Sequence, residues 1–404
     1  MQKLSRLFPV SLLTLGFFIT TSNISTAQIA TDNTVGTQVN RDGNVTEITG
    51  GSIRGNNLFH SFQDFSVPTA QEARFNNATN ISTIFSRVTG GNISNIDGTI
   101  GANGSASLFF MNPAGIIFGE NARLDIGGSF LGSSSNSILF PDGIEFRADD
   151  LQANPVLTVN APIGLGFRDN PGEIINNSLA NNGRGLEVSS GNSLSLLGGN
   201  ITFNGGRITL PAGIVNLGGL SAAGEITIDG ENNFGFPDGV GRGNISLENN
   251  AIVDISSNGG GTISVNGNNL TFTGESLFLA GIKEGLGNQD AVAGTIAINA
   301  NNISASQNSQ VRSDNSGIGR GGTIEITTNT LDFIEDSAIV VSSFGSGDAG
   351  TVSITAQDVS FDNEWGGIYS TLGLTRIATE EPINDAFGNA GSVEIDTGSL
   401  SLTF

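Results

Sequence analysis

The chain has 404 residues, of which 37% are hydrophobic and 58 are glycine, and its formal net charge at pH 7 is −22. A chain of this length can bury a large core, but this much glycine excludes an ordinary helical or α/β protein. The acidic surface repels nucleic acid and anionic lipid headgroups, so no nucleic-acid partner is expected, and the absence of cysteine excludes disulfides.

The first 27 residues have the order of a secretory signal peptide. Lys3 and Arg6 give a positive start, residues 12–19 an apolar centre, and residues 25–27 a cleavage site of small side chains. The apolar run is too short and too interrupted for a membrane span, which takes about 20 residues. We therefore predict a signal peptide over residues 1–27; a membrane anchor or a buried helix is the alternative.

Beyond residue 27 the chain shows almost no helical periodicity. Short segments such as Ile324 to Ile326 and Val352 to Ile354 alternate apolar and polar residues, and Gly, Asn, Ser and Asp separate them. This pattern predicts an all-β protein.

Residues 108–119, LFFMNPAGIIFG, predict two strands joined by a tight turn. Asn112 suits the first position of a type I turn because its side chain can bond the backbone two residues on, Pro113 presets the second position, and Gly115 suits the fourth. Ala114 at the third position fits type I, whereas type II would require a positive φ that a β-carbon opposes.

The second half of the chain repeats one pattern five times, starting from Gly261, Gly294, Gly322, Gly350 and Gly391. Four apolar positions keep their offset from each glycine. The first two positions hold Ile263 and Val265, Ile296 and Ile298, Ile324 and Ile326, Val352 and Ile354, and Val393 and Ile395. The last two hold Leu270 and Phe272, Ile303 and Ala305, Leu331 and Phe333, Val359 and Phe361, and Leu400 and Leu402.

A constant part followed by a variable loop is typical of a solenoid, in which each copy is one coil. Looser copies begin at Gly224 and Gly243. Within one copy we expect strands over residues 323–327 and 330–334 and a third strand near residues 338–342. The predicted fold is therefore a right-handed parallel β-helix with an N-terminal cap and extra-helical β elements.

Asparagine pairs recur at matching offsets in these copies, at Asn268-Asn269 and Asn301-Asn302. We expect them at turns, where asparagine tolerates left-handed backbone conformations, and we expect their side chains to form ladders from coil to coil.

Residues 92–135, which contain the Asn112 turn, closely resemble the hallmark region of the filamentous haemagglutinin N-terminal domain, also called the two-partner secretion domain. The family motif reads Asn-Pro-Asn-Gly-Ile, followed by a phenylalanine, a glycine and an Asp-Ile-Gly-Gly-Ser strand. The resemblance implies that the secretion motif of this chain is Asn112, Pro113, Ala114, Gly115 and Ile116. Only Ala114 departs from it, since the family usually has asparagine there.

The resemblance covers nearly the whole chain after residue 27, and it implies the domain organisation. Residues 155–167 and 198–220 look like the segments that close this domain in large cyanobacterial exoproteins. We expect the secretion domain over residues 28–170 and a β-helix continuation over 171–404. A second family hallmark, Asn-Pro-Asn-Leu, is absent, although residues 75–78 lie in a comparable region.

The resemblance also implies function. By analogy, the periplasmic domains of an outer-membrane barrel transporter recognise the N-terminal domain, and the rod folds outside the cell. The expected product is a secreted or surface-associated, adhesin-like exoprotein with a glycan or protein receptor, without catalysis or cofactor.

The alternative function is a carbohydrate-active β-helix enzyme, a lyase or glycosidase. The predicted outward position of the five copies reads Ser264, Ala297, Glu325, Ser353 and Glu394. Two acids with one coil between them would lie about 10 Å apart, given a coil spacing of about 4.8 Å. Glycosidase carboxyl pairs lie about 5–9.5 Å apart, so solvated surface acids explain these residues better.

Two further observations concern single residues. His60 is the one histidine, so a multi-histidine metal site is impossible and no metal is expected. The sole tryptophan, Trp365, and nearby Tyr369 fall where the repeat spacing expands, which predicts a loop off the rod. Such an aromatic loop could stack on a glycan; local packing is the alternative.

Overall fold

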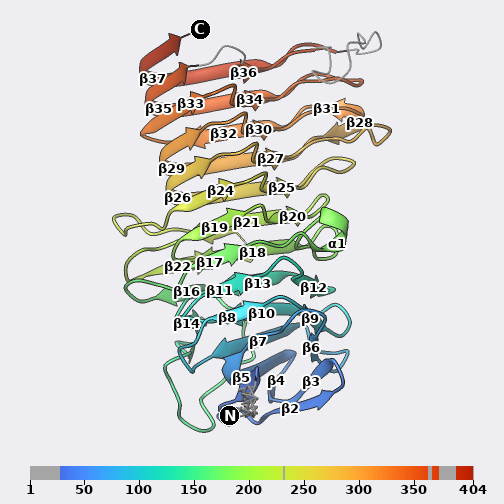
Figure 1. Ribbon diagram of the computed structural model, residues 1–404, viewed down its shortest axis with the longest axis vertical. Helices are drawn as coiled ribbons and strands as arrows, with labels where there is room; N and C mark the ends of the chain where they lie inside the picture. Colours follow the sequence, from blue (N-terminus) through green and yellow to red (C-terminus); the bar gives the residue numbers. More distant parts are fainter. Residues whose placement is uncertain (1–27, 231–232, 363–365, 373–387, 404) are drawn as a thin grey trace, which may run out of the picture.

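The structure is a computed structural model that describes residues 28–230, 233–362, 366–372 and 388–403. It is a rod of stacked coils, with the N-terminal coils at one end and the C-terminal coils at the other (Figure 1). The predicted signal peptide lies outside the described residues. Within them, no helix combines the length and apolar character needed to cross a membrane.

The largest sheet forms two of the faces of the coils. Its first row consists of β5 (Asn57–Phe65), β7 (Thr83–Val88), β10 (Ser107–Met111), β13 (Phe130–Ser133), β18 (Ser193–Gly198) and β21 (Ile214–Gly219). Its second row consists of β8 (Ser94–Ile96), β11 (Ile116–Phe118), β17 (Ile174–Asn176), β19 (Ile201–Asn204) and β24 (Ile245–Glu248). Strands within each row pair in parallel, as a β-helix requires.

Towards the C-terminal end the two rows join. Four long strands run through both of them: β26 (Thr262–Phe272), β29 (Thr295–Ala305), β35 (Thr351–Asp362) and β37 (Ser392–Thr403). Between β29 and β35 the coil keeps two separate strands, β32 (Thr323–Thr327) and β33 (Thr330–Ile334).

A third face completes the coils. At the N-terminal end it contains β3 (Val45–Gly50), β6 (Glu72–Phe75), β9 (Thr99–Ala102) and β12 (Arg123–Asp125). Further along it contains β20 (Arg207–Thr209), β25 (Ile252–Asp254), β27 (Leu277–Leu279), β30 (Gln310–Arg312), β34 (Ala338–Val340) and β36 (Gly367–Tyr369). The short helical element α1 (Ala180–Gly183) lies between these two sets in the sequence.

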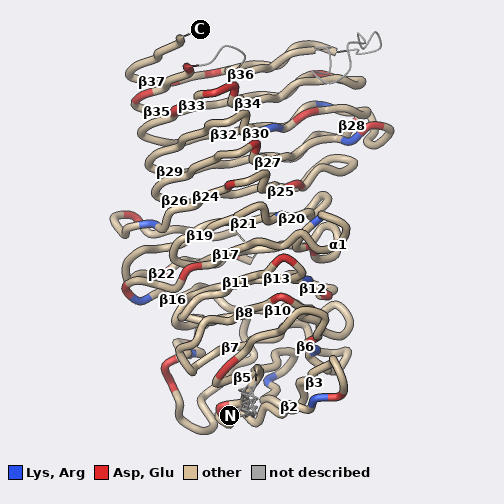
Figure 2. The backbone as a smooth tube through the Cα atoms, in the orientation of Figure 1, with Lys and Arg blue, Asp and Glu red and all other residues tan. Residues whose placement is uncertain are grey.

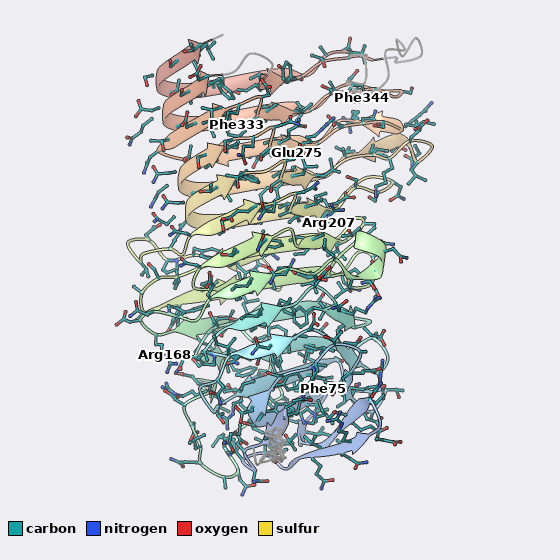
Figure 3. The ribbon with its side chains drawn as sticks, viewed as in Figure 1. Phe75, Arg168, Arg207, Glu275, Phe333 and Phe344 are labelled. Atoms are coloured by element: carbon teal, nitrogen blue, oxygen red, sulfur yellow. The ribbon has the colours of Figure 1, made fainter. Side chains whose placement is uncertain are left out.

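The predicted repeat is confirmed in its register. Ile263 pairs with Ile296, Ile296 with Ile324, and Ile324 with Val352, and all four side chains are buried. Phe333, labelled in Figure 3, pairs with Ala305 and Phe361 in the neighbouring coils and is completely buried. Each such side chain contributes roughly 1.5–3 kcal/mol once the next coil covers it. The strands predicted over residues 323–327 and 330–334 are β32 and β33, and the strand predicted near residues 338–342 is β34, which ends at Val340.

The last described coil shows how strongly a neighbouring coil reduces the exposure of the apolar row. Val393, Leu400 and Leu402 in β37 are 43%, 49% and 52% exposed. Their partners in β35, which β37 covers, are at most 3% exposed. The apolar row of one coil is therefore buried by its neighbour, and not by its own fold.

The two looser copies were placed wrongly in the stack. The copy at Gly224 forms β22 (Gly224–Ile228), which leaves the coils and pairs antiparallel with β16 (Gly164–Phe167). The copy at Gly243 forms β24, but Ile245 pairs with Leu270 and not with Ile263. A short alternating segment has the same pattern whichever neighbour it pairs with, so its position depends on contacts distant in sequence.

The asparagine ladders are confirmed, but the expected turn conformation is wrong. Nδ2 of Asn301 donates to Oδ1 of Asn268 at 3.0 Å, and Nδ2 of Asn302 donates to Oδ1 of Asn269 at 2.9 Å. None of the four has a positive φ, because β26 and β29 run straight through these positions.

The N-terminal end of the rod is capped. β1 (Ile29–Thr31) and β4 (Ser52–Arg54) both pair antiparallel with β5, and β2 (Thr37–Asp42) pairs antiparallel with β3. These strands occupy the backbone edges of the first coil, which would otherwise be open to pairing with another chain.

Two sets of strands lie outside the coils. A five-stranded antiparallel sheet, here called the side sheet, contains β14 (Ser137–Leu139), β15 (Glu145–Arg147), β16, β22 and β23 (Phe234–Gly235). Further along the rod, β28 (Gly287–Val292) pairs with β31 (Ile318–Arg320). The predicted extra-helical elements are therefore present.

The buried apolar side chains form two clusters. The first runs along the inside of the coils. The second, here called the outer core, lies between the first coils and the side sheet. It comprises Val35, Phe59, Phe85, Met111, Leu131, Ile138, Phe140, Phe146, Ala148, Leu157, Leu165, Phe167, Leu197, Leu220 and Ile226.

Figure 2 shows the charged residues scattered along the coils and at their turns. Among the described residues, the side chains of Arg87 and Asp314 are the charged ones that are buried.

Candidate functional site

The predicted secretion motif forms the corner between β10 and β11. The amide N–H of Gly115 donates to the carbonyl oxygen of Asn112 at 3.0 Å, and Oδ1 of Asn112 accepts from the amide of Ala114 at 3.0 Å. Ala114 does not adopt a positive φ. These are the features of a type I turn opened by an asparagine side chain, so the predicted turn is confirmed.

Asn112 connects this corner to the coils on both sides of it. Its Nδ2 donates to the carbonyl oxygen of Asn92 and to Oγ of Ser94, both at 2.9 Å. Its backbone amide donates to the carbonyl oxygen of Ser133 at 2.9 Å. The side chain is completely buried, so loss of the amide would leave several buried groups without partners.

The corner is also tightly stacked on the following coil. The amide of Gly172 donates to the carbonyl oxygen of Pro113 at 3.1 Å, and the amide of Ile116 donates to the carbonyl oxygen of Glu173 at 3.0 Å. Gly115 has a φ of 115°, and a Cβ there would lie 2.6 Å from the oxygen of Glu173. Only glycine fits this position without a backbone shift.

The motif is therefore inside the rod. Asn112, Pro113, Gly115 and Ile116 are buried, and Ala114 alone is partly exposed. In the folded chain these side chains can set the shape of the coil, but they offer almost no surface to a partner. Sequence reasoning identified the turn and missed its partners Asn92, Ser94 and Gly172, because they lie 18 to 59 residues from the residues that they bond.

Asn77, in the region compared with the second family hallmark, has the same type of contact. Its Oδ1 accepts from the amide of Asn103 at 2.9 Å, and its Nδ2 donates to the carbonyl oxygen of Asn103 at 3.1 Å. Asn77 and Asn112 thus each join neighbouring coils, and they do so at different corners of the rod.

His60 has a structural environment. Nδ1 lies 3.2 Å from Oγ1 of Thr37, and the ring packs against Phe62 and Phe75. Burial lowers the pKa of His60 to about 3, so the ring is neutral at neutral pH. Within the described ranges, no group of three or more His, Asp or Glu side chains could hold a metal ion.

The outward row predicted in the repeats is confirmed in its geometry. Glu325 pairs with Ser353, and Ser353 with Glu394, so one coil separates the two acids. Both glutamates are exposed. Trp365 lies outside the described residues. Tyr369 is part of β36 and pairs with Val340, so it belongs to the stack itself.

The chain was compared with known families and structures. The family described as TPS secretion domain matches residues 27–265. Among solved structures, the HMW1 secretion domain from Haemophilus influenzae is similar with a TM-score of 0.55 and 18% identity, over 93% of this chain and 98% of that one. A filamentous haemagglutinin secretion domain matches with a TM-score of 0.34 and 14% identity, over 91% and 97%. No curated protein matches.

Proposed function

This chain belongs to the TPS secretion domain family and is thus an exoprotein of a two-partner secretion pathway, and we propose that its N-terminal coils engage the periplasmic domains of the outer-membrane transporter before they fold. The transporter carries the chain across the outer membrane to the cell exterior, where it is released or stays at the surface.

The observation that carries the proposal is the burial of the secretion motif. A partner that read Asn112 to Ile116 in the folded rod would find four of the five residues covered. The motif is accessible only while the chain is unfolded, which is also the state in which it can pass a narrow pore. In the folded protein the same residues act as a corner that joins three coils.

The architecture suits export without an external energy source. Each coil needs only the preceding coil as a template, and each new coil buries the apolar row of the one before it. The cap formed by β1, β2 and β4 gives the first coil a finished edge. Folding outside the membrane would therefore follow emergence of the chain and oppose its return.

Beyond export, the exoprotein acts as an adhesin-like rod without catalysis. The outward acids of the repeats are exposed, with one coil between them, and this arrangement fits a solvated surface better than a glycosidase pair. Trp365 and Tyr369 stay candidates for contact with a glycan receptor. Titrating surface glycans while following the fluorescence of the sole tryptophan tests this role, and a lack of response to every glycan would remove it.

The export proposal is tested by secretion of matched variants co-expressed with a two-partner transporter. Asn112→Ala and Gly115→Ala should each lower the amount of protein in the medium severalfold, because each disturbs the corner. Asn302→Ala is the control, since this asparagine lies in an exposed ladder and should be secreted normally.

Stability measurements separate the two roles of the motif. If secretion falls in proportion to the loss of folding free energy, the corner role is sufficient. If secretion falls while the purified variant is as stable as the parent, the unfolded motif is read directly. Normal secretion of both motif variants, or secretion without the transporter, would contradict the proposal.

A further inference from the structure

The first four coils carry apolar side chains on their outer face as well as inside. Phe59 pairs with Phe85, Phe85 with Phe109, and Phe109 with Leu131, so these four form one outward row. Met111 and Leu197 lie in the adjacent outward row. A face of this kind is costly to leave in water, and in the finished structure the side sheet covers it.

The side sheet comes from two later excursions of the chain. The first leaves the rod after β13 and returns at β17, and it supplies β14, β15 and β16. The second leaves after β21 and returns at β24, and it supplies β22 and β23. Every strand of the apolar outward row therefore precedes every strand of its cover in the sequence.

The side sheet is a separate unit from the coils. No ladder joins it to the strands of the rod among the described residues. It is held mainly by side chains: Phe146 packs edge-on against Phe59 with ring centroids 5.2 Å apart, and Phe140 packs against Phe85 at 5.4 Å. Units that share few backbone hydrogen bonds with their surroundings can open without global unfolding.

Where the chain leaves the rod after β13, two buried side-chain oxygens lack hydrogen-bond partners. Oγ of Ser135 and Oδ1 of Asn136 are buried and have no hydrogen-bond partner. Each such group costs free energy in the closed state and can bind water in the open one. This segment therefore favours opening of the sheet at its base.

One buried cation holds the sheet closed. Arg87 projects from β7 beside Met111, and its guanidinium lies 4.5 Å from the ring centroid of Phe146. It donates to the carbonyl oxygen of Arg147 in β15, to Oγ of Ser61 at 2.8 Å and to Oγ1 of Thr34 at 3.1 Å. The side chain thus connects the rod, the side sheet and the segment after β1, and opening would break these bonds together.

The segment after β1 adds the countercharge. The carboxylate of Asp32 accepts from Oγ of Ser61, from Oγ1 of Thr34 and from Oγ1 of Thr89. Ser61 and Thr34 also accept from Arg87, so acid and cation share two hydroxyl groups. Arg87, Asp32 and the hydroxyl groups between them therefore form one hydrogen-bond network that joins segments far apart in the sequence.

We propose that the outer face of the first coils is an interaction surface for an amphipathic β-hairpin, and that the side sheet opens from it as one unit controlled by Arg87. In the finished protein the β14–β15 hairpin covers this face, and its side chains indicate what kind of partner fits. The β14–β15 hairpin places Ile138, Phe140 and Phe146 against the face and leaves Glu145 and Arg147 outward. A partner must likewise present alternate large apolar side chains on one side of a hairpin.

The proposed surface rests on the proposed function in one respect: it would be open to a partner during export. During export the outward row up to Leu131 emerges before any strand of the side sheet. A hairpin supplied by the transporter would cover the row until the chain's own hairpin displaces it. The test below uses only the purified protein, so it can fail while the export proposal stands.

Hydrogen exchange of the purified full-length protein measures the opening. Amides of β14, β15, β16 and β22 should exchange together, at least about tenfold faster than those of β5, β7 and β10, as expected for a sub-global unit. Arg87→Met should accelerate the first group by a further tenfold or more and leave the second unchanged, because several buried hydrogen bonds to a charge are lost. Arg242→Met is the control: it removes a partly exposed guanidinium that lies 5.6 Å from the Phe236 ring.

Binding is measured with a labelled peptide of residues 136–148, the hairpin itself. It should bind Arg87→Met at least tenfold more tightly than the parent, and replacing Phe140 and Phe146 of the peptide by serine should abolish binding. If Arg87→Met does not fold, Arg87→Lys and the parent protein serve for both measurements.

Three results would overturn the proposal. The strands of the side sheet could exchange no faster than those of the coils, which would make the two one cooperative unit. The peptide could fail to bind a variant whose sheet opens. Arg87→Met could form a dimer that exchanges side sheets, in which case the occupant is a second copy of the chain.

Discussion

One outward row of side chains runs along the whole rod and changes its chemistry on the way. It begins as Phe59, Phe85, Phe109 and Leu131 in the first coils. The same row continues through Ser195 and Asn216, and then through Ser264, Ala297, Glu325, Ser353 and Glu394 in the repeats. The backbone pairing is the same in both regions. What differs is whether a second layer covers the row.

The comparison shows two ways in which one fold is specified. In the repeats, each coil is defined by its own four inward residues and by the coil beside it. In the first coils, the same inward pattern is joined to an outer core that brings together strands far apart in the sequence, such as β5 and β15, or β16 and β22. The N-terminal region therefore depends on contacts distant in sequence, whereas the repeat region depends almost wholly on adjacent coils.

The largest effect is expected where the outward row is covered. Phe85 is completely buried and contacts Phe59, Phe109 and Phe140. Phe85→Ala should lower the free energy of unfolding of the N-terminal region by about 3–5 kcal/mol, the range for buried phenylalanine. Denaturation followed by hydrogen exchange in both regions checks this. Equal destabilisation of the repeats would show that the regions are not independent.

A test of the inward row compares a covered coil with an uncovered one. Ile324→Ala removes a completely buried side chain and should cost about 2–5 kcal/mol. Val393→Ala, in the last described coil, should cost less than about 1 kcal/mol because Val393 is already 43% exposed. Urea denaturation of the two variants measures the difference. Similar losses would mean that β37 is covered in solution.

Acidification should affect only the N-terminal region through histidine, because His60 is the one histidine of the chain. Its folded pKa of about 3 lies below the unfolded value, so between the two the unfolded chain binds a proton that the folded chain does not. Stability from this group is therefore present above pH 6.5 and is lost as the pH falls. By pH 4 the loss should reach about 3 kcal/mol, at 1.36 kcal/mol per pH unit.

The measurement is the pH dependence of unfolding for the parent and for His60→Gln. The variant lacks the titrating ring, so the loss between pH 7 and pH 4 should shrink by about that amount. An unchanged pH dependence would show that protonated His60 is tolerated in the fold. Asp32 adds to the loss of stability at still lower pH. Burial raises the pKa of its carboxyl, but hydrogen bonds from Ser61, Thr34 and Thr89 outweigh burial and keep the pKa below its usual value, so the stability from this group is also lost as the pH falls.

The smallest effect is expected where the row is uncovered. Glu325→Phe places the side chain of the first coils into the repeat region, where no second layer exists among the described residues. The folding free energy should change by less than about 0.5 kcal/mol, as for most surface substitutions. Thermal unfolding of the variant measures this. A clear gain in stability would mean that something covers this face.

The repeat region could be predicted from the sequence because its information is local. The offsets of Ile263, Ile296, Ile324 and Val352 from their glycines determine which residues face inward. Parallel stacking of the coils then places these residues against one another. The side sheet could not be predicted, because Gly224 to Ile228 has the same alternation as a coil strand. One signal was available: four consecutive apolar residues from Leu108 to Met111 indicate a strand that is buried on both faces.

The candidate site was predicted to a similar degree. The turn at Asn112 follows from local chemistry, since asparagine, proline and glycine each have a reason for their position. Its burial, and its bonds to Asn92 and Ser94, depend on coils that no local pattern identifies. For the same reason the buried Arg87 went unnoticed, because a single arginine in a strand has no sequence signature.

Because the register of the repeats is fixed, whole copies can be added or removed, and each changes the length of the rod by the same amount. Residues 322–349 form one complete copy, and removing them would place β35 directly on β29, with Val352 against Ile296. The shortened rod would lose about 4.8 Å, the spacing of neighbouring strands, and keep its cap, its corner and its side sheet. A lineage of such proteins can therefore change the length of its rod by gaining or losing whole copies, without redesigning any contact.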